Sequence, residues 1–338
     1  MISVLLPVFN AAPFLKECLN SLLAQTEQDW EVIAVNDFST DSSLEILRDY
    51  GRLDGRIRVF ENREKGIIPA LRLGFSKSLG TYITRTDADD IAPPRKLACL
   101  KNALLAKGEH TLSVGLVEYF LSSAPDHAQR QSPRLGYLQY QNWLNTLTAL
   151  ENNWTGIYKE CPIPSPCWMV LREDLIGCGG FEPNTYPEDY DLAFRFYKAR
   201  LKVAGVREVL HLWRDHAERT SRTDSKYSDN RFLELKLSYF LELDRSPGMP
   251  LAIWGAGEKG KWIGKQLSDR RIPFHWLTNN PKKIGHTIYG VRLESPAILE
   301  IPDGICRQVI VAVSSPGEQE ALKNELAKLA LVTAFFFC

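Results

Sequence analysis

The chain has 338 residues, of which 44% are apolar and 24% charged, with 41 basic residues against 41 acidic ones. This composition is typical of a globular protein, and the length is sufficient for two domains. A net charge of zero argues against a nucleic-acid partner. No apolar run reaches the ~18 residues of a transmembrane helix, so any membrane association should be peripheral, at the inner face of the membrane.

Seven cysteines at irregular spacing indicate reduced thiols and therefore predict a cytoplasmic protein. Cys161, Cys167 and Cys178 are too unevenly spaced to predict a zinc site. We expect all the cysteines to be buried or inert.

Strand and helix patterns alternate in the N-terminal part of the chain. Apolar runs and intervening helical stripes predict, in order, strand 2–8, helix 13–25, strand 30–35, helix 42–50, strand 56–61, helix 68–79 and strand 80–85. This alternation predicts a parallel sheet with helices on both faces. Ligands of such sheets bind beyond the carboxyl ends of the strands, so segments 7–10, 36–41 and 87–90 should converge on one crevice.

Three carboxylates follow the strand predicted at 80–85, namely Asp87, Asp89 and Asp90. Like charges this close repel one another unless a cation or hydrogen-bond donors compensate. Mg²⁺ prefers oxygen ligands and completes its shell with substrate phosphates. The acidic run therefore predicts a site for a metal-bound diphosphate. The alternative is that one of these acids caps the helix that begins near 93–94.

The remaining chain divides into an irregular stretch and a second region of alternating elements. Residues 111–166, rich in aromatic and amide side chains, predict either an excursion that shapes a substrate pocket or a surface insertion. A helical stripe at 230–243 and linker composition at 244–250 precede a new strand at 251. The predicted domains are 1–225 and 250–338, joined by a helix and linker at 226–249.

Gly255, Gly257 and Gly260 form a dinucleotide-binding fingerprint between a predicted strand and a predicted helix. The acidic residue that should follow about 20 positions later is missing from segment 274–280. The domain resembles small Rossmann-like α/β modules appended to sugar-modifying enzymes. We expect a folding, docking or regulatory nucleotide-binding role rather than redox catalysis, with the three glycines as candidate cofactor contacts.

Six motifs of the N-terminal region occur in the order and spacing of one known family. They are LPVFN at 6–10, VNDFSTD at 35–41, YITRTDADD at 82–90, GGF at 179–181, PEDYDL at 187–192 and RDH at 214–216. With these motifs the chain resembles family 2 glycosyltransferases over residues 1–225. The resemblance implies the GT-A type of α/β fold, in which helices flank a mixed sheet that binds a nucleotide sugar.

The resemblance also implies contacts with a nucleotide-sugar donor. Phe9 would stack on the nucleotide base, Asp37 would accept a hydrogen bond from a base N–H, and Asp87 would face the ribose or the metal. The alternative for Asp37 is a turn-stabilising role. The implied donor-binding residues are Pro7, Val8, Phe9, Asn10, Asp37, Arg72, Asp87 and Ala88.

Metal binding and proton transfer are the other implied roles. Asp89 would ligate Mn²⁺ or Mg²⁺, which neutralises charge on the departing diphosphate, and His216 would complete that site. Asp189 would be the general base for the acceptor hydroxyl, with Glu188 as the second candidate. The alternative is that 188–192 is only an acidic first turn favoured by the helix dipole.

The predicted function is an inverting transfer of a sugar, with UDP as the expected nucleotide, to a hydroxyl of a glycan or lipid-linked acceptor in polysaccharide biosynthesis. Two alternatives stay open. One is an NAD-dependent sugar-modifying enzyme whose chemistry lies in the C-terminal domain, and the other is a non-catalytic nucleotide-sugar-binding protein.

Overall fold

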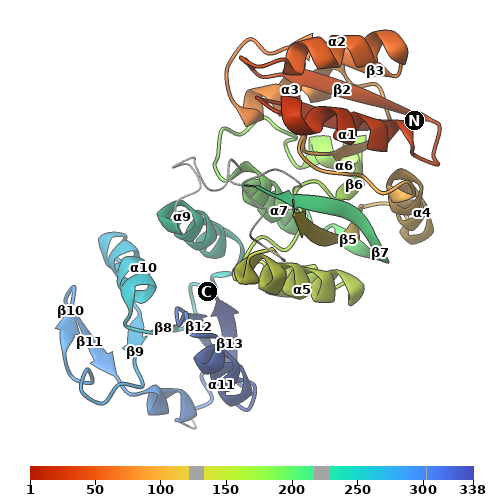
Figure 1. Ribbon diagram of the computed structural model, residues 1–338. Coiled ribbons are helices and arrows are strands. Elements are labelled where there is room, and N and C mark those ends of the chain that lie inside the picture. The colour runs from red at the N-terminus through yellow and green to blue at the C-terminus, as the bar shows by residue number, and fades with distance from the viewer. Residues whose placement is uncertain (122–132, 217–228, 302) are drawn as a thin grey trace. The chain divides into compact units, whose positions relative to one another are not determined.

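The computed structural model describes residues 1–121, 133–216, 229–301 and 303–338. The chain divides into two compact units, of which the first comprises Met1–Thr155 with Cys161–Tyr227 and the second Gly156–Glu160 with Ser228–Cys338 (Figure 1). The domain boundaries after 225 and 249 stay predictions. Among the described residues, no helix combines the length and the apolar character needed to cross a bilayer.

The first unit contains a seven-stranded mixed sheet in the order β3-β2-β1-β4-β6-β5-β7. Only β6 among these strands runs antiparallel to its neighbours. Its strands are β1 (Ile2–Val8), β2 (Trp30–Asn36), β3 (Ile57–Glu61), β4 (Tyr82–Arg85), β5 (Thr111–Leu121), β6 (Trp168–Leu171) and β7 (Lys202–Asp215). Central strands such as β2 are buried on both faces, which explains the continuous apolar runs in the sequence.

Helices of the first unit pack on this sheet through apolar stripes. In α1 the buried side chains are Leu15, Cys18, Leu19 and Leu22, the spacing of one helical face. The helices are α1 (Ala12–Leu23), α2 (Ser43–Leu53), α3 (Ile67–Lys77), α4 (Lys96–Lys107), α5 (Leu135–Ala149), α6 (Arg172–Gly177) and α7 (Glu188–Lys198), with a 3₁₀ turn η2 (Asn153–Gly156). The elements predicted up to 85 are therefore confirmed, with ends shifted by at most three residues.

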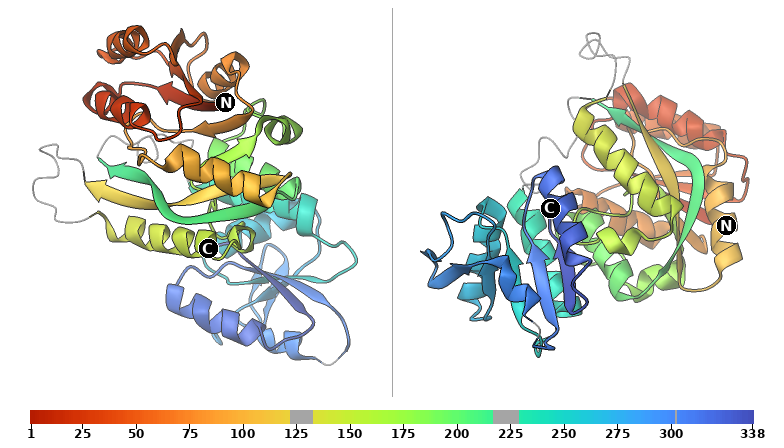
Figure 2. Two further views of the ribbon diagram at one scale, coloured as in Figure 1. Left: turned by 90° about the vertical axis from the view of Figure 1, so that its right-hand side faces the viewer. Right: turned by 90° about the horizontal axis from the view of Figure 1, so that it is seen from below.

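The expectation of an irregular stretch at 111–166 was wrong where the structure describes it; residues 122–132 lie outside the described chain. β5 and β7 pair side by side, and α5 lies along them (Figure 2). The sequence of α5 shows no clear apolar stripe, because some of the residues that face the sheet are polar. The side-chain oxygen Oε1 of Gln141 accepts from the Tyr119 N–H, and the Asn145 side chain bonds both backbone groups of Val117.

The second unit contains a six-stranded sheet in the order β10-β11-β9-β8-β12-β13, in which only β10 is antiparallel. Its five parallel strands have the order typical of doubly wound nucleotide-binding folds. The strands are β8 (Leu251–Trp254), β9 (His275–Leu277), β10 (Thr287–Ile288), β11 (Val291–Glu294), β12 (Arg307–Val311) and β13 (Val332–Phe336). The helical elements are α9 (Asp229–Tyr239), η4 (Phe240–Asp244), α10 (Glu258–Asp269), η5 (Pro296–Glu300) and α11 (Pro316–Leu326).

Replacing Gly205 with alanine should destabilise the first unit. A Cβ atom at this position would lie 2.0 Å from the carbonyl oxygen of Thr148, and such overpacking costs about 1–3 kcal/mol. Urea unfolding should therefore show a lower midpoint with an unchanged slope. Gly136→Ala is the control, because its Cβ would meet nothing within 4 Å. An equal loss in both variants would contradict the steric explanation.

Candidate active site

The candidate site lies at one edge of the first sheet. Strands β1, β2 and β4 are mutually parallel, and β7 runs parallel to β5. Because β6 reverses direction between β4 and β5, the carboxyl ends of β1, β2, β4 and β7 point the same way. Phe9, Asp37, Asp87 and His216 each follow one of these ends, where open α/β sheets bind ligands.

The three acids after β4 have three different partners. Asp87 Oδ1 lies 2.8 Å from Arg85 Nη2, and Asp89 Oδ2 lies 2.8 Å from His216 Nε2. Asp90 is buried, with its Oδ2 2.8 Å from Nε2 of His211. None of them caps α4, which begins after Arg95 without a side-chain cap. The helix-capping alternative for this run is therefore wrong.

A buried polar chain runs inward from Asp90. Lys96 Nζ lies 3.1 Å from His211 Nδ1 and donates to the carbonyl oxygen of Pro166 at 2.6 Å. Burial lowers the pKa of Lys96, although Asp90 opposes the shift. The other oxygen of Asp90 accepts from the backbone N–H of Arg214 at 2.8 Å. Sequence reasoning missed Lys96 and His211, since neither belongs to a local motif.

Arg85 joins the acids after β4 to the first turn of α7. Its side chain is 4% exposed, and Nη1 lies 3.4 Å from Glu188 Oε1. Burial would lower the pKa of Arg85, but Asp87 and Glu188 outweigh it and raise that pKa, so the guanidinium stays charged. Burial and then the neighbouring Glu188 raise the pKa of Asp189 to about 7, against the opposing effect of Arg85.

The opposite side of the site is built from the ends of β1 and β2. Asp37 is 6% exposed, and its carboxylate accepts from the Gly66 N–H at 2.9 Å and from Asn62 Nδ2 at 2.7 Å. Phe9 is 48% exposed, and Lys65 Nζ lies 4.6 Å from the centroid of its ring. Asp37 thus organises the loop that carries Lys65. The sequence contained no motif that would have predicted a role for Lys65.

The backbone of the turn after β2 is held by side chains. The Asn10 side-chain oxygen accepts from the Thr40 N–H at 2.8 Å, which ties the end of β1 to this turn. Phe38 has φ of +59°, a conformation that glycine adopts more readily. The turn therefore has a left-handed backbone at Phe38 although this residue is not a glycine.

The other predicted donor contacts lie in different surroundings. Val8 and Ala88 are buried, and Pro7 is half-buried within β1. Arg72 is engaged elsewhere, because its Nη2 donates to the Glu182 carbonyl oxygen and to Asn184 Oδ1. Arg72 thus anchors the segment that leads toward α7. The glycines Gly255, Gly257 and Gly260 belong to the second unit.

Asp89 and His216 are the pair in this site with the donor atoms for a divalent cation. A carboxylate oxygen and an imidazole nitrogen suit Mn²⁺, and substrate phosphates commonly supply further ligands. Within the described parts of the chain, no group of three or more His, Cys, Asp or Glu residues has metal-site geometry. These two side chains therefore fit a partial metal site that a diphosphate would complete.

The family model for Glycosyl transferase family 2 matches residues 3–177 of this chain. Uncharacterized glycosyltransferase EpsJ of Bacillus subtilis is 43% identical over 90 residues, covering 27% of this chain but only 26% of EpsJ. Glycosyltransferase GlyG of Streptococcus pneumoniae is 27% identical over 230 residues, covering 66% of this chain and 74% of GlyG.

Solved structures share the fold at low identity. The structure of S. aureus TarS 1-349 in complex with UDP-GlcNAc has a TM-score of 0.51 at 18% identity, covering 79% of this chain and 71% of that one. The structure of GalNAc-T7 with UDP, GalNAc and Mn²⁺ has a TM-score of 0.53 at 16% identity, covering 81% of this chain and 51% of that one. This likeness confirms the predicted fold class.

Replacing Arg85 with methionine should destabilise the protein strongly. The buried carboxylate of Glu188 and the partly exposed one of Asp87 would lose their shared cation, and breaking a buried pair in this way costs about 3–5 kcal/mol. Arg95→Met is the matched control, because that side chain is 66% exposed and pairs with a half-exposed Glu208, so its loss should cost under ~1 kcal/mol. Chemical unfolding measures both; equal costs would rule out the bridging role.

Proposed function

Because this chain belongs to glycosyl transferase family 2, we propose that it moves a sugar from a nucleotide-diphosphate sugar to an acceptor hydroxyl with inversion at the anomeric carbon. The observation that carries this proposal is the Arg85 bridge between Asp87 and Glu188. It joins the acids after β4 to the helix turn that holds Asp189. The proposed donor-binding group and the proposed proton acceptor are thus linked through one buried side chain.

Asp189 is the proposed general base. Its carboxylate takes the proton of the acceptor hydroxyl while that oxygen bonds to the anomeric carbon. The bond to the nucleoside diphosphate breaks on the opposite side, and the leaving group departs with the bonding electrons. A base is most effective when its pKa is near the working pH, and the pKa of Asp189 is raised to about 7. Glu188 is the weaker candidate, because it already faces Arg85.

The donor end of the crevice is proposed to hold the nucleotide, with UDP as the expected one. The half-exposed ring of Phe9 offers a stacking face to a base. Asp89 and His216 would hold Mn²⁺ or Mg²⁺, which when bound stabilises negative charge on the departing diphosphate. The GalNAc-T7 structure, which shares this fold, contains UDP and Mn²⁺.

A growing glycan or a lipid-linked glycan is the proposed acceptor. Relatives of this chain include the Bacillus subtilis proteins EpsJ and EpsE, both named as glycosyltransferases, and a chondroitin synthase of Pasteurella multocida. The name of the chondroitin synthase states that it makes a polymer of sugars. In such a synthesis the acceptor is a hydroxyl group on a glycan. Polysaccharide biosynthesis is therefore the proposed setting.

Asp189→Asn should lower kcat for sugar transfer by about 10²–10⁴-fold, because the amide does not accept the proton. In the parent, kcat should rise with pH through about 7, since the raised pKa of Asp189 leaves its carboxyl protonated below that pH. The asparagine variant should lose this dependence. Initial rates from pH 5 to 9 test both points.

Asp191→Asn is the control for this experiment. Asp191 lies in the same helical turn, but its Oδ2 accepts from Arg195 Nε at 2.8 Å, so its loss should affect stability more than the pH profile. A parent profile without an inflection near pH 7, or full transfer by the Asp189 variant, would contradict the assignment of the base.

Asp89→Ala should weaken metal-dependent UDP binding, because the carboxylate next to His216 is removed. Calorimetry with UDP and Mn²⁺ should show affinity lower by about tenfold or more, the value of one charge-assisted contact. Without Mn²⁺ the parent and the variant should bind UDP equally weakly. Asp54→Asn lies in the loop before β3, away from the carboxyl ends of the strands. It should change the UDP affinity neither with nor without Mn²⁺. Affinity that is independent of Mn²⁺ in the parent would contradict the metal role.

A further inference from the structure

A cavity of about 530 Å³ lies at the carboxyl ends of β8, β9 and β12 in the second unit. The chain continues from β8 to β9 on one side and returns to β12 on the other. Open α/β sheets bind ligands at such a reversal of strand order. The volume lies within the range of about 300–1,000 Å³ found for small-molecule sites.

The glycine turn between β8 and α10 forms one wall of this cavity. Gly255 has φ of +129°, and a Cβ at Gly260 would lie 2.0 Å from the Gly255 carbonyl oxygen, so both glycines are needed for packing. Gly257 differs, because its φ is −83° and a Cβ would meet nothing within 4 Å. A methyl group is therefore tolerated there. The N-terminal backbone of α10 next to Gly257 lines the cavity, the arrangement that accepts phosphate groups.

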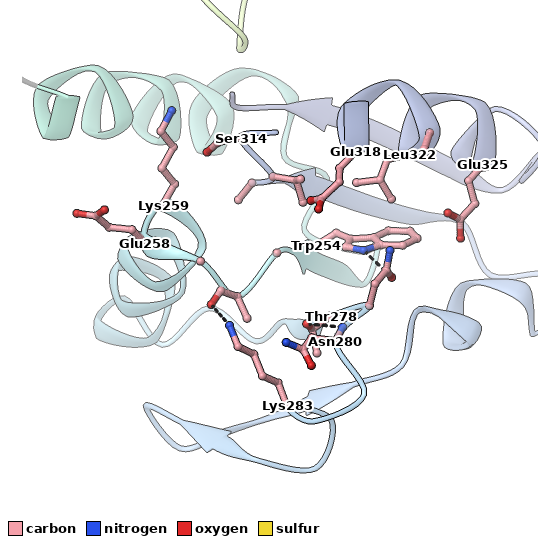
Figure 3. A pocket seen from close by; sticks show the side chains of 17 residues that line it. Trp254, Glu258, Lys259, Thr278, Asn280, Lys283, Ser314, Glu318, Leu322 and Glu325 are labelled. Carbon is pink, nitrogen blue, oxygen red and sulfur yellow. Dashed lines mark hydrogen bonds between the residues drawn. The ribbon is translucent and has the colours of Figure 1, made fainter. Parts of the chain in front are cut away.

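Charged side chains lie on two sides of the same space. Lys283 reaches the turn from the loop after β9, and its Nζ donates to the Ala256 carbonyl oxygen at 3.3 Å. Figure 3 shows Glu318 reaching in from α11, while Glu258 and Lys259 point away from the space between Lys283 and Glu318. Glu318 has no ion pair with any described residue. A cation beside the turn suits phosphate, and a carboxylate across from it suits sugar hydroxyls.

The end of β9 lacks the carboxylate that holds the ribose of a redox dinucleotide. Asn279 stands there instead, and its side-chain oxygen accepts from Trp254 Nε1 at 3.2 Å. The side-chain oxygen of Asn279 thus already accepts a hydrogen bond from another residue of the cavity wall. The glycine fingerprint is present without the group that would select NAD.

We propose that this cavity binds a nucleoside diphosphate, free or joined to a sugar, with the diphosphate against turn 255–258 and Lys283 and hydroxyls toward Glu318. This second nucleotide site is separate from the donor site proposed for the first unit and does not depend on it. It uses no divalent cation, because Lys283 and the helix N-terminus supply the positive charge.

The test is calorimetry of the full chain with UDP, ADP and NADH in EDTA, which removes metal-dependent binding. At least one diphosphate should bind, and NADH should bind more weakly than that diphosphate. Gly257→Asp adds a negative charge in open space and should weaken binding by about tenfold or more, as should Lys283→Gln. Gly257→Ala and Lys282→Gln are the matched controls and should bind like the parent.

Three results would overturn the proposal. They are no binding of either diphosphate in EDTA, equal affinity in the parent and in folded Gly257→Asp, and tighter binding of NADH than of both diphosphates. Circular dichroism of each variant establishes that it is folded. Sugar transfer is assayed separately, so loss of this site and loss of the proposed catalytic function are distinguished.

Discussion

The guanidinium of Arg85 makes the interaction on which the candidate site of the first unit depends. It lies within 2.8 Å of Asp87 and 3.4 Å of Glu188, and so joins the end of β4 to the start of α7. The buried acid Glu188 and the partly exposed acid Asp87 thus share one cation beside Asp189. Burial and then Glu188 raise the pKa of Asp189, against the opposing effect of Arg85. A carboxyl whose surroundings raise its pKa can transfer a proton while a neighbouring acid serves another role.

Adjacent acids in the run after β4 serve different purposes because the backbone turns between them. Asp89 contacts His216 at the site, whereas Asp90 points into the protein toward His211 and the backbone of Arg214. The buried acid fixes the end of β7 relative to the end of β4. The partly exposed acid Asp89 can then hold a ligand without moving, since its neighbour already positions the backbone.

Both units follow one rule of α/β proteins, in which the carboxyl ends of parallel strands and the N-termini of helices meet at one edge. In the first unit this edge collects side-chain acids, so phosphate binding there, as proposed, would call for a cation. In the second unit it presents a glycine turn with Lys283, and backbone N–H groups can bind phosphate directly. The two proposed sites would therefore bind phosphate in two different physical ways.

The sequence by itself determined the order of elements up to residue 85 and the location of the acids and glycines, because buried strands and amphipathic helices carry their own periodicity. It did not indicate α5, whose polar residues face β5. Nor did it indicate that Arg85 bridges to Glu188, 103 positions away, or that Lys96 meets His211, 115 positions away. Such pairs form only when the strands are assembled, so tertiary structure alone decided which charges compensate one another.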